Sequence, residues 1–247
     1  MRRVVVPPLI AACALLGAQV AVGDEPIVAD RPGFGESASA VAPLHLQLES
    51  GLNWTRVDGD TTAEDAPELL LRLGSVRGLE LRVAVPEWVG STTAGQRSTG
   101  WTDTSLGLKG HLSAGGHDLS LRATAYLPSG SASQSSNRVD PELALAWSHS
   151  LGGPWSLGST VSERWFRDVG QALTSPSLSL GRSLGAGAGT FLEYGSTFGD
   201  GVRPVHRLDH GYTWDPSPST QIDVSLGIAL SPAAPDFFVA AGFCHRF

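Results

Sequence analysis

From residue 44 to the end of the chain, apolar and polar residues alternate in short segments separated by turn-forming residues. In residues 221–230, for example, every even position is apolar: Ile222, Val224, Leu226, Ile228 and Leu230. A period of two places successive side chains on opposite faces of a β-strand, whereas a helix needs a period of 3.6. The pattern therefore predicts strands with one apolar and one polar face.

Twelve such segments can be counted, at residues 44–55, 67–74, 78–86, 102–112, 117–127, 140–149, 155–165, 174–184, 186–195, 205–214, 220–230 and 236–247. Short connections alternate with longer polar ones at residues 56–66, 87–100, 128–139, 166–173 and 196–204. An even strand count with alternating short and long connections is typical of bacterial outer-membrane barrels. We therefore expect an all-β fold, a twelve-stranded antiparallel transmembrane β-barrel. The alternative is a soluble β-sandwich.

The composition favours the barrel. Charged residues make up 17% of the chain, whereas about a quarter is usual in soluble proteins. After the first two dozen residues, no apolar run approaches the roughly 20 residues of a spanning helix. The tryptophans lie at or just beyond segment ends, as in the aromatic girdles of membrane barrels; they are Trp54, Trp88, Trp101, Trp147, Trp155, Trp165 and Trp214.

The chain divides into three parts. Residues 1–23 resemble a signal peptide, with Arg2 and Arg3 before an apolar stretch and a small-residue site at its end. Cys13 lies inside that stretch, so lipidation is disfavoured. Residues 24–43 have no periodicity, and residues 44–247 form the barrel. The net charge is −7 and becomes more negative without the two arginines, which argues against a nucleic-acid partner.

The polar face of the segments collects most of the charged residues, which would point into the lumen. They are Glu49, Glu68, Arg72, Glu80, Arg82, Lys109, His111, Arg122, Glu142, Glu193, Arg207, Asp209 and Asp223. Ion pairs that simply fill the interior are the plainer interpretation, and a polar path for solutes is the other. Glu163 and Arg182 fall on the apolar face instead, near segment ends, which fits positions at the membrane interface or at a bulge.

The irregular segment 24–43 carries its own charged motif, made by Asp30, Arg31, Pro32 and Glu36. If the segment folds back into the lumen, these charges meet those of the wall. It would then act as a plug. The alternative is that the segment stays in the periplasm.

Enzymatic and metal sites are weakly indicated. Ser148 and His149 lie side by side, as a hydrolase on a barrel wall would need, but adjacent strand residues face opposite sides and no third group is evident. We place His149 in a turn. Other histidines lack metal-ligand spacing, and no cofactor motif is found. We expect no catalytic residue, no metal and no cofactor.

Five motifs resemble one known family. They are Asp-Arg-Pro-Gly-Phe-Gly-Glu-Ser at 30–37, His-Leu-Gln-Leu-Glu-Ser-Gly at 45–51, Pro-Glu-Leu-Leu-Leu-Arg-Leu-Gly at 67–74, Asp-Thr-Ser-Leu-Gly-Leu-Lys at 103–109 and Leu-Pro-Ser-Gly at 127–130. The family comprises outer-membrane proteins associated as transporters with the phenol meta-cleavage pathway. The resemblance spans nearly the whole mature chain and implies uptake of aromatic or other hydrophobic compounds.

Together these observations predict a channel or transporter in the bacterial cell outer membrane, for passive passage of small, hydrophobic or aromatic solutes. The alternatives are a closed structural or surface-interaction barrel and, less favoured, an outer-membrane lipid hydrolase. The expected partners are outer-membrane lipid and lipopolysaccharide, the solute, and the barrel-assembly machinery. The terminal Phe247 resembles the signal that this machinery recognises.

Overall fold

The computed structural model describes residues 25–76 and 78–247. The predicted signal peptide and Cys13 lie outside these residues. Within them, no helix is long and apolar enough to cross a membrane.

The described chain is built of antiparallel strands. In chain order they are β1 (Leu46–Arg56), β2 (Thr61–Gly74), β3 (Leu79–Val85), β4 (Trp88–Thr93), β5 (Gln96–Trp101), β6 (Ser105–Ala114), β7 (His117–Tyr126), β8 (Asp140–Gly152), β9 (Trp155–Phe166), β10 (Gln171–Gly185), β11 (Ala188–Gly199), β12 (Val205–Ser217), β13 (Thr220–Ala229) and β14 (Phe237–Arg246).

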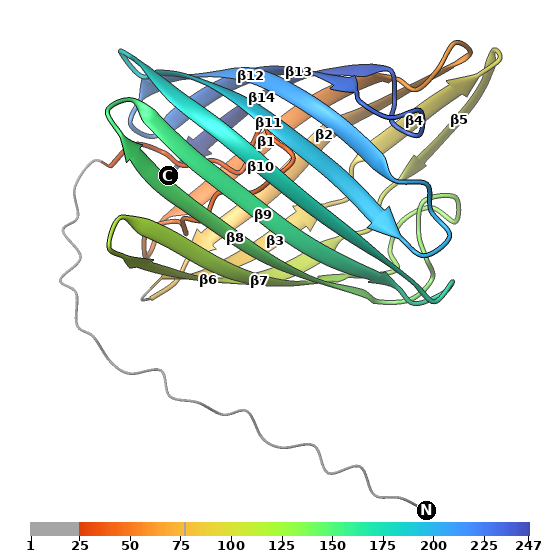
Figure 1. Cartoon of the computed structure of the whole chain (residues 1–247). Helices are drawn as coiled ribbons and strands as arrows, with labels where there is room; N and C mark the ends of the chain where they lie inside the picture. The colour runs from red at the N-terminus through yellow and green to blue at the C-terminus, as the bar shows by residue number, and fades with distance from the viewer. Residues whose placement is uncertain (1–24, 77) are drawn as a thin grey trace, which may run out of the picture.

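The strands form one closed barrel with a side branch (Figure 1). β1 pairs with β14 on one side and with β2 on the other, which closes the sheet. β3 pairs with β6, so the hairpin of β4 and β5 lies outside the circular order. Its strand β4 pairs instead with residues 61–66, the first half of β2. The closed barrel therefore has twelve antiparallel strands, which confirms the predicted fold.

Four predicted connections are wrong in part. Residues 87–100 form the β4–β5 hairpin, and β2 begins at Thr61, inside the predicted loop 56–66. The predicted loops 166–173 and 196–204 shrink to residues 167–170 and 200–204, because β9, β10 and β11 continue past the expected ends. The residues added to β9, β10 and β11 mix apolar and polar side chains over short stretches, so the period-two hydrophobic signal does not mark them.

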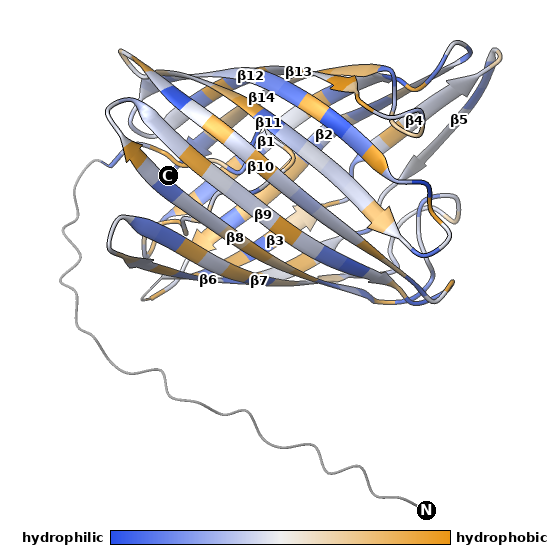
Figure 2. Cartoon of the chain, in the orientation of Figure 1, coloured by the Kyte–Doolittle hydropathy of each residue, from blue (hydrophilic) through white to orange (hydrophobic). Residues whose placement is uncertain are grey.

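The wall is apolar outside and polar inside, as β13 demonstrates. Val224 and Leu226 are each 50% exposed, whereas Asp223, which precedes Val224, is 1% exposed. Bands of hydrophobic residues recur across the outer face of the strands (Figure 2). A surface of this kind is stable only against hydrocarbon, and closure leaves no unpaired strand edge within the circular wall.

The two ends of the barrel differ. Tight turns join the strands at one end, here called the turn end, where the described N-terminal segment begins and the C-terminus lies (Figure 1). The other end, the loop end, carries the β4–β5 hairpin and the 127–139 loop. In bacterial barrels short turns are periplasmic and longer loops extracellular.

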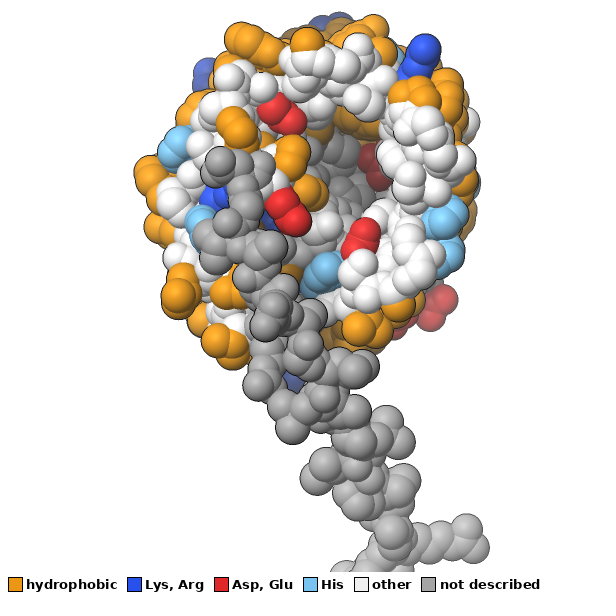
Figure 3. Space-filling view, turned by 90° about the vertical axis from the view of Figure 1, so that its left-hand side faces the viewer, with side chains coloured by type: hydrophobic (Ala, Val, Ile, Leu, Met, Phe, Trp, Pro, Cys, Tyr) orange, Lys and Arg blue, Asp and Glu red, His pale blue; other side chains and the backbone are white. Residues whose placement is uncertain are grey.

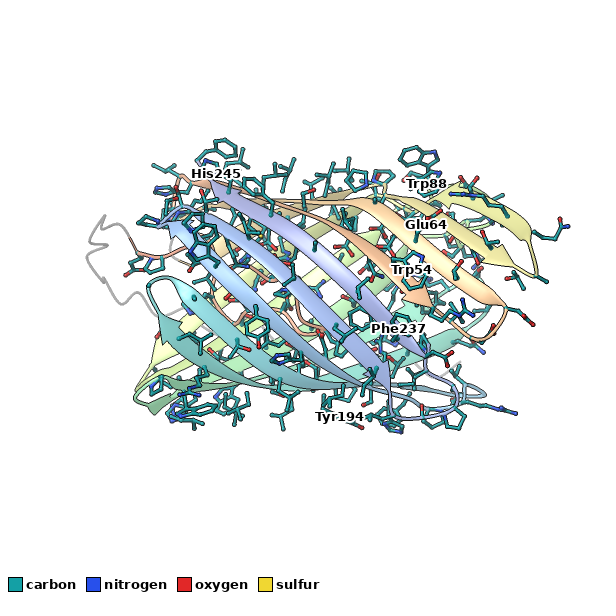
Figure 4. All side chains as sticks on the ribbon, turned by 90° about the horizontal axis from the view of Figure 1, so that it is seen from above. Trp54, Glu64, Trp88, Tyr194, Phe237 and His245 are labelled. Atoms are coloured by element: carbon teal, nitrogen blue, oxygen red, sulfur yellow. The ribbon has the colours of Figure 1, made fainter. Side chains whose placement is uncertain are left out.

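Outward aromatic residues lie near both ends of the barrel. Figure 4 shows Trp88 and Tyr194 pointing outward toward the loop end and His245 at the turn end. The two charged residues predicted on the apolar face, Glu163 and Arg182, do face outward. The β9–β10 register has no bulge at either position. The Arg182 guanidinium lies 5.1 Å from the Trp155 ring centre near the turn end, a position typical of an interface.

Candidate functional site

The irregular N-terminal segment lies inside the barrel. Its backbone is hydrogen-bonded at the turn end, where the Ile27 amide donates to the Pro218 carbonyl over 2.7 Å. It then crosses the lumen and returns toward the start of β1, where the Val41 amide donates to Glu80 over 2.8 Å. We call residues 27–41 the plug. The lumen is therefore occupied along one path by the chain's own backbone.

A buried ion-pair cluster holds the plug against β1, β2 and β3. Arg72, fully buried, contacts Glu49 at 2.6 Å, Glu80 at 2.8 Å and Asp30 of the plug at 3.4 Å. Arg82 contacts the other oxygen of Asp30 at 2.6 Å. Since these groups are removed from water, each depends on its partners, and loss of one leaves an uncompensated charge.

The Arg72 guanidinium also joins the two arms of the plug. It donates to the Val28 carbonyl over 3.1 Å and to the Ser39 carbonyl over 3.3 Å. The entering and returning arms therefore lie side by side at this arginine. The segment is a loop that enters and leaves the lumen at the same end.

Glu36 extends the cluster to β6 and β7. Its carboxylate contacts Arg122 at 2.9 Å and Lys109 at 3.6 Å, and Arg122 also contacts Glu142 at 2.7 Å. Lys109 is fully buried and lies 3.5 Å from Asp30. Both acidic residues of the plug are thus matched by cations of the wall.

The tip of the plug contacts β2 and, farther round the barrel, β11 and β13. Arg31 pairs with Glu68 and lies 3.7 Å from Asp223. Glu193 of β11 accepts hydrogen bonds from the amides of Phe34 at 2.6 Å and Gly35 at 2.9 Å. One carboxylate therefore binds two successive backbone N–H groups, which is a strong charge-assisted arrangement.

Arg207 differs from the other lumen cations. Among the described residues it takes part in no ion pair within 4.0 Å, and its guanidinium lies 4.4 Å from the centre of the Phe34 ring. It faces the cavity on the loop side of the plug. Its charge is thus stacked on an aromatic face rather than neutralised by a direct partner.

Cavities lie on both sides of the plug. The loop-side cavity has a volume of about 370 Å³, and the turn-side cavity about 380 Å³. Both are lined by Asp30, Arg31, Pro32 and Gly33, so this part of the plug separates them. A further hollow of about 580 Å³ lies among the turn-end residues of β8–β12, and Figure 3 shows the molecule hollowed at this end.

The turn-side space is lined largely by small residues. We call this wall the serine sector, defined by Ser148, Ser156, Gly158, Ser177, Ser179, Gly181, Gly189 and Thr213. These side chains are short, so they leave the lumen open beside the plug. The opposite wall, from β1 to β3 with β6 and β7, carries the long side chains of the ion-pair cluster.

The structure places all ten predicted lumen residues on the inner wall. Eight form ion pairs with the plug or with one another, Glu193 accepts hydrogen bonds from the plug, and Arg207 stacks on Phe34. His111, also predicted to face the lumen, lies 3.0 Å from Asp118. The N-terminal motif of Asp30, Arg31, Pro32 and Glu36 lies among them inside the barrel.

Two features of the interior were not expected from the sequence. Phe34 and Phe238 meet inside the lumen, with ring centres 5.7 Å apart and an interplanar angle of 66°. Phe238 lies on the polar face of the last strand, and this break in the alternation is the available sequence signal. Asp140 is also buried inside, where it accepts a hydrogen bond from the Arg167 amide over 2.9 Å.

The placement of His149 in a turn is wrong, because β8 continues to Gly152. Its ring stacks on His117 with 4.1 Å between ring centres. Ser148 lines the turn-side cavity. The serine therefore faces the lumen while the histidine stacks on a neighbouring strand, and the two do not form a nucleophile and base pair.

One group of carboxylates near the loop end is close enough to share a cation. Ligand atoms of Asp65, Glu68 and Glu87 lie within 4.8 Å of one another. Two of them already have partners, since Glu68 pairs with Arg31 and Asp65 accepts a hydrogen bond from Asn53 over 3.1 Å. Burial, with a smaller contribution from Asp65, raises the pKa of Glu87 to about 7.

Comparison with solved structures places the fold among outer-membrane channels. An outer membrane channel from Pseudomonas putida F1 superimposes with a TM-score of 0.68 at 15% identity, covering 88% of this chain and 99% of that one. The KdgM porin gives 0.57 at 10% identity, covering 81% and 99%. The NanC porin gives 0.56 at 7% identity, covering 82% and 100%.

Comparison of sequences gives the family. No curated protein matches the chain. The family model described as "Putative MetA-pathway of phenol degradation" matches residues 29–247, which include most of the plug and the whole barrel. The predicted resemblance is thereby confirmed, and the chain belongs to this family.

Proposed function

We propose that this protein is an outer-membrane channel for passive passage of small, hydrophobic or aromatic solutes. The observation that carries the proposal is the pair of cavities on the two sides of the plug, which share the residues of the plug tip as a common wall. A solute would have to pass only this constriction. The serine sector would lead from there to the turn end.

The solute class rests on family membership and on the cavity walls. The family description names phenol degradation, and the loop-side cavity contains the Phe34 and Phe238 rings. A barrel of about eight strands is filled by its own side chains, while 16 to 18 strands leave an open channel. Twelve strands with a plug therefore fit a narrow passage for small molecules.

The location and the partners follow from the same fold. The apolar outer face fits outer-membrane lipid and lipopolysaccharide, and the turn end would face the periplasm. We also propose the barrel-assembly machinery as a partner, through Phe247, which is 65% exposed. We propose the bacterial outer membrane as the location, with no nucleic-acid partner.

Conductance and uptake by the folded protein test the proposal. In planar bilayers the channel should carry a small but measurable current, and proteoliposomes should take up phenol faster than empty liposomes. Correctly folded protein that gives neither current nor uptake would favour the rival function, a closed structural or surface-interaction barrel. Release of fatty acid from lipid by the wild type would instead favour the hydrolase.

A further inference from the structure

The loop-side cavity has one wall suited to a flat apolar ring. Its apolar lining comes from Pro32, Phe34, Leu70, Pro235, Phe238 and Ala240. Its volume of about 370 Å³ exceeds the roughly 150 Å³ that is enough for benzene in a protein interior. A single substituted ring therefore fits with room to reorient.

Two glycines of the wall seat the two phenylalanines. A Cβ atom at Gly195 of β11 would lie 2.5 Å from Phe34, and one at Gly227 of β13 would overlap the Phe238 ring. Any other residue at these positions would displace the rings. The aromatic wall is thus a packed arrangement of plug and barrel, with the two rings tilted at 66°.

Arg207 supplies a cation beside this wall. Its guanidinium already stacks on Phe34 at 4.4 Å, and no carboxylate oxygen of the described residues lies within 4.0 Å of it. A guanidinium attracts the face of an aromatic ring within about 6 Å. A ring that enters the cavity can therefore contact both an aromatic edge and a cation.

The surrounding charges select against an anion. Asp30, Glu49 and Glu68 of this cavity have cationic partners. Arg207 is two residues from Asp209 along β12, and Glu193 of β11 lies across from Asp209, diagonal to Arg207. Over the plug and inner wall, carboxylates outnumber cations. The carboxylates are Asp30, Glu36, Glu49, Glu68, Glu80, Asp140, Glu142, Glu193, Asp209 and Asp223; the cations are Arg31, Arg72, Arg82, Lys109, Arg122, Arg164 and Arg207.

We infer that the loop-side cavity is a binding subsite for an uncharged aromatic ring, held by Phe34, Phe238 and Arg207. The inference deepens the proposed channel function, on which its role in transport rests. Binding itself does not require passage. A ring that binds here lies against the plug tip, at the entrance to the constriction.

Titration of the folded, detergent-solubilised protein with three probes tests the subsite. Phenol is uncharged and aromatic at pH 7, cyclohexanol has the same size without the π-face, and benzoate carries a carboxylate. Saturation-transfer NMR should give saturable binding of phenol. Cyclohexanol and benzoate should each bind at least about three-fold more weakly than phenol. Cyclohexanol lacks the aromatic contacts, and benzoate adds a negative charge to a lumen in which carboxylates already outnumber cations.

A pair of neighbouring phenylalanines provides the matched variants. Phe238→Leu keeps an apolar side chain in the cavity and should weaken phenol binding about three- to ten-fold. Phe237→Leu changes the lipid-facing neighbour, which packs on Trp54, and should bind phenol like the wild type. Heat-modifiable migration on gels confirms that each variant is folded.

The outcomes separate the subsite from the channel. Equal binding of phenol and cyclohexanol, or unchanged phenol binding in folded Phe238→Leu, overturns the subsite even if the protein conducts. If phenol binds as expected but wild-type protein shows neither current nor uptake, the subsite stands and the channel function fails. A Phe238→Leu variant that fails to fold is replaced by Arg207→Met, which should also weaken phenol binding.

Discussion

The two halves of the polar lumen wall differ in the size and charge of their side chains. From β1 to β3 and in β6 and β7, long charged side chains form ion pairs with the plug and with one another. From β8 to β12 the inner wall is largely serine, glycine and threonine, and it lines the cavities at the turn end. The charged half fixes the plug, and the serine sector leaves the space through which a solute would move.

Breaking the charged half should have the largest effect. In Arg72→Met, the buried Glu49, Glu80 and Asp30 lose their shared cation, and we expect the free energy of unfolding to fall by about 3–5 kcal/mol. Urea unfolding in detergent micelles measures it. Arg97→Met removes the exposed pair with Glu64 and should cost less than about 1 kcal/mol. Equal losses in the two variants would contradict a special role for the buried cluster.

Removing the plug should produce the next largest effect. Because the Val28 and Ser39 carbonyls bind the same arginine, residues 29–38 can be replaced by two glycines without stretching the chain. We expect single-channel conductance to rise several-fold, since the constriction is gone while the wall remains. A conductance equal to that of the wild type would mean that the plug does not constrict the path taken by ions.

The serine sector can be closed with one side chain. Ser179 lines the turn-side cavity, so Ser179→Tyr should reduce conductance and phenol uptake to roughly half or less, since an aromatic ring fills the space beside the plug. Leu178→Tyr places the same side chain on the adjacent, 50% exposed outer position and should leave both unchanged. A loss in Leu178→Tyr alone would place the path elsewhere.

The sequence predicted the part of the fold that contacts lipid. Period-two hydrophobicity records which residues face hydrocarbon, and it found every strand of the closed barrel. The β4–β5 hairpin escaped because its strands are rich in Thr, Ser and Gly. Its turn, with Ala94 and Gly95 at positive φ, is a weaker signal than Asn-Gly.

The site was predictable only as a set of inward charges. The alternation assigned Glu49, Arg72 and Glu193 to the lumen, but it could not tell which of them the plug engages. Those contacts join residues far apart in the chain, such as Asp30 with Arg82 and Phe34 with Glu193. They depend on the path of an aperiodic segment, for which local sequence carries no rule.

The smallest expected effect concerns pH at the loop end. Glu87 lies in the connection between β3 and β4, and burial raises its pKa to about 7. The carboxyl is therefore neutral at pH 6 and mostly ionised at pH 8, where it adds a negative charge beside Asp65 and Glu68. We expect the cation-to-anion permeability ratio, obtained from the reversal potential in a salt gradient, to rise roughly twofold from pH 6 to pH 8.

Two variants serve as test and control. Glu87→Gln should keep the permeability ratio constant over this pH range. Asp58 lies in an exposed loop and its carboxyl has a lowered pKa, so Asp58→Asn should show the same pH dependence as the wild type. A pH dependence that persists in Glu87→Gln would assign the titration to another group and leave the mouth of the charged half without a role in ion selection.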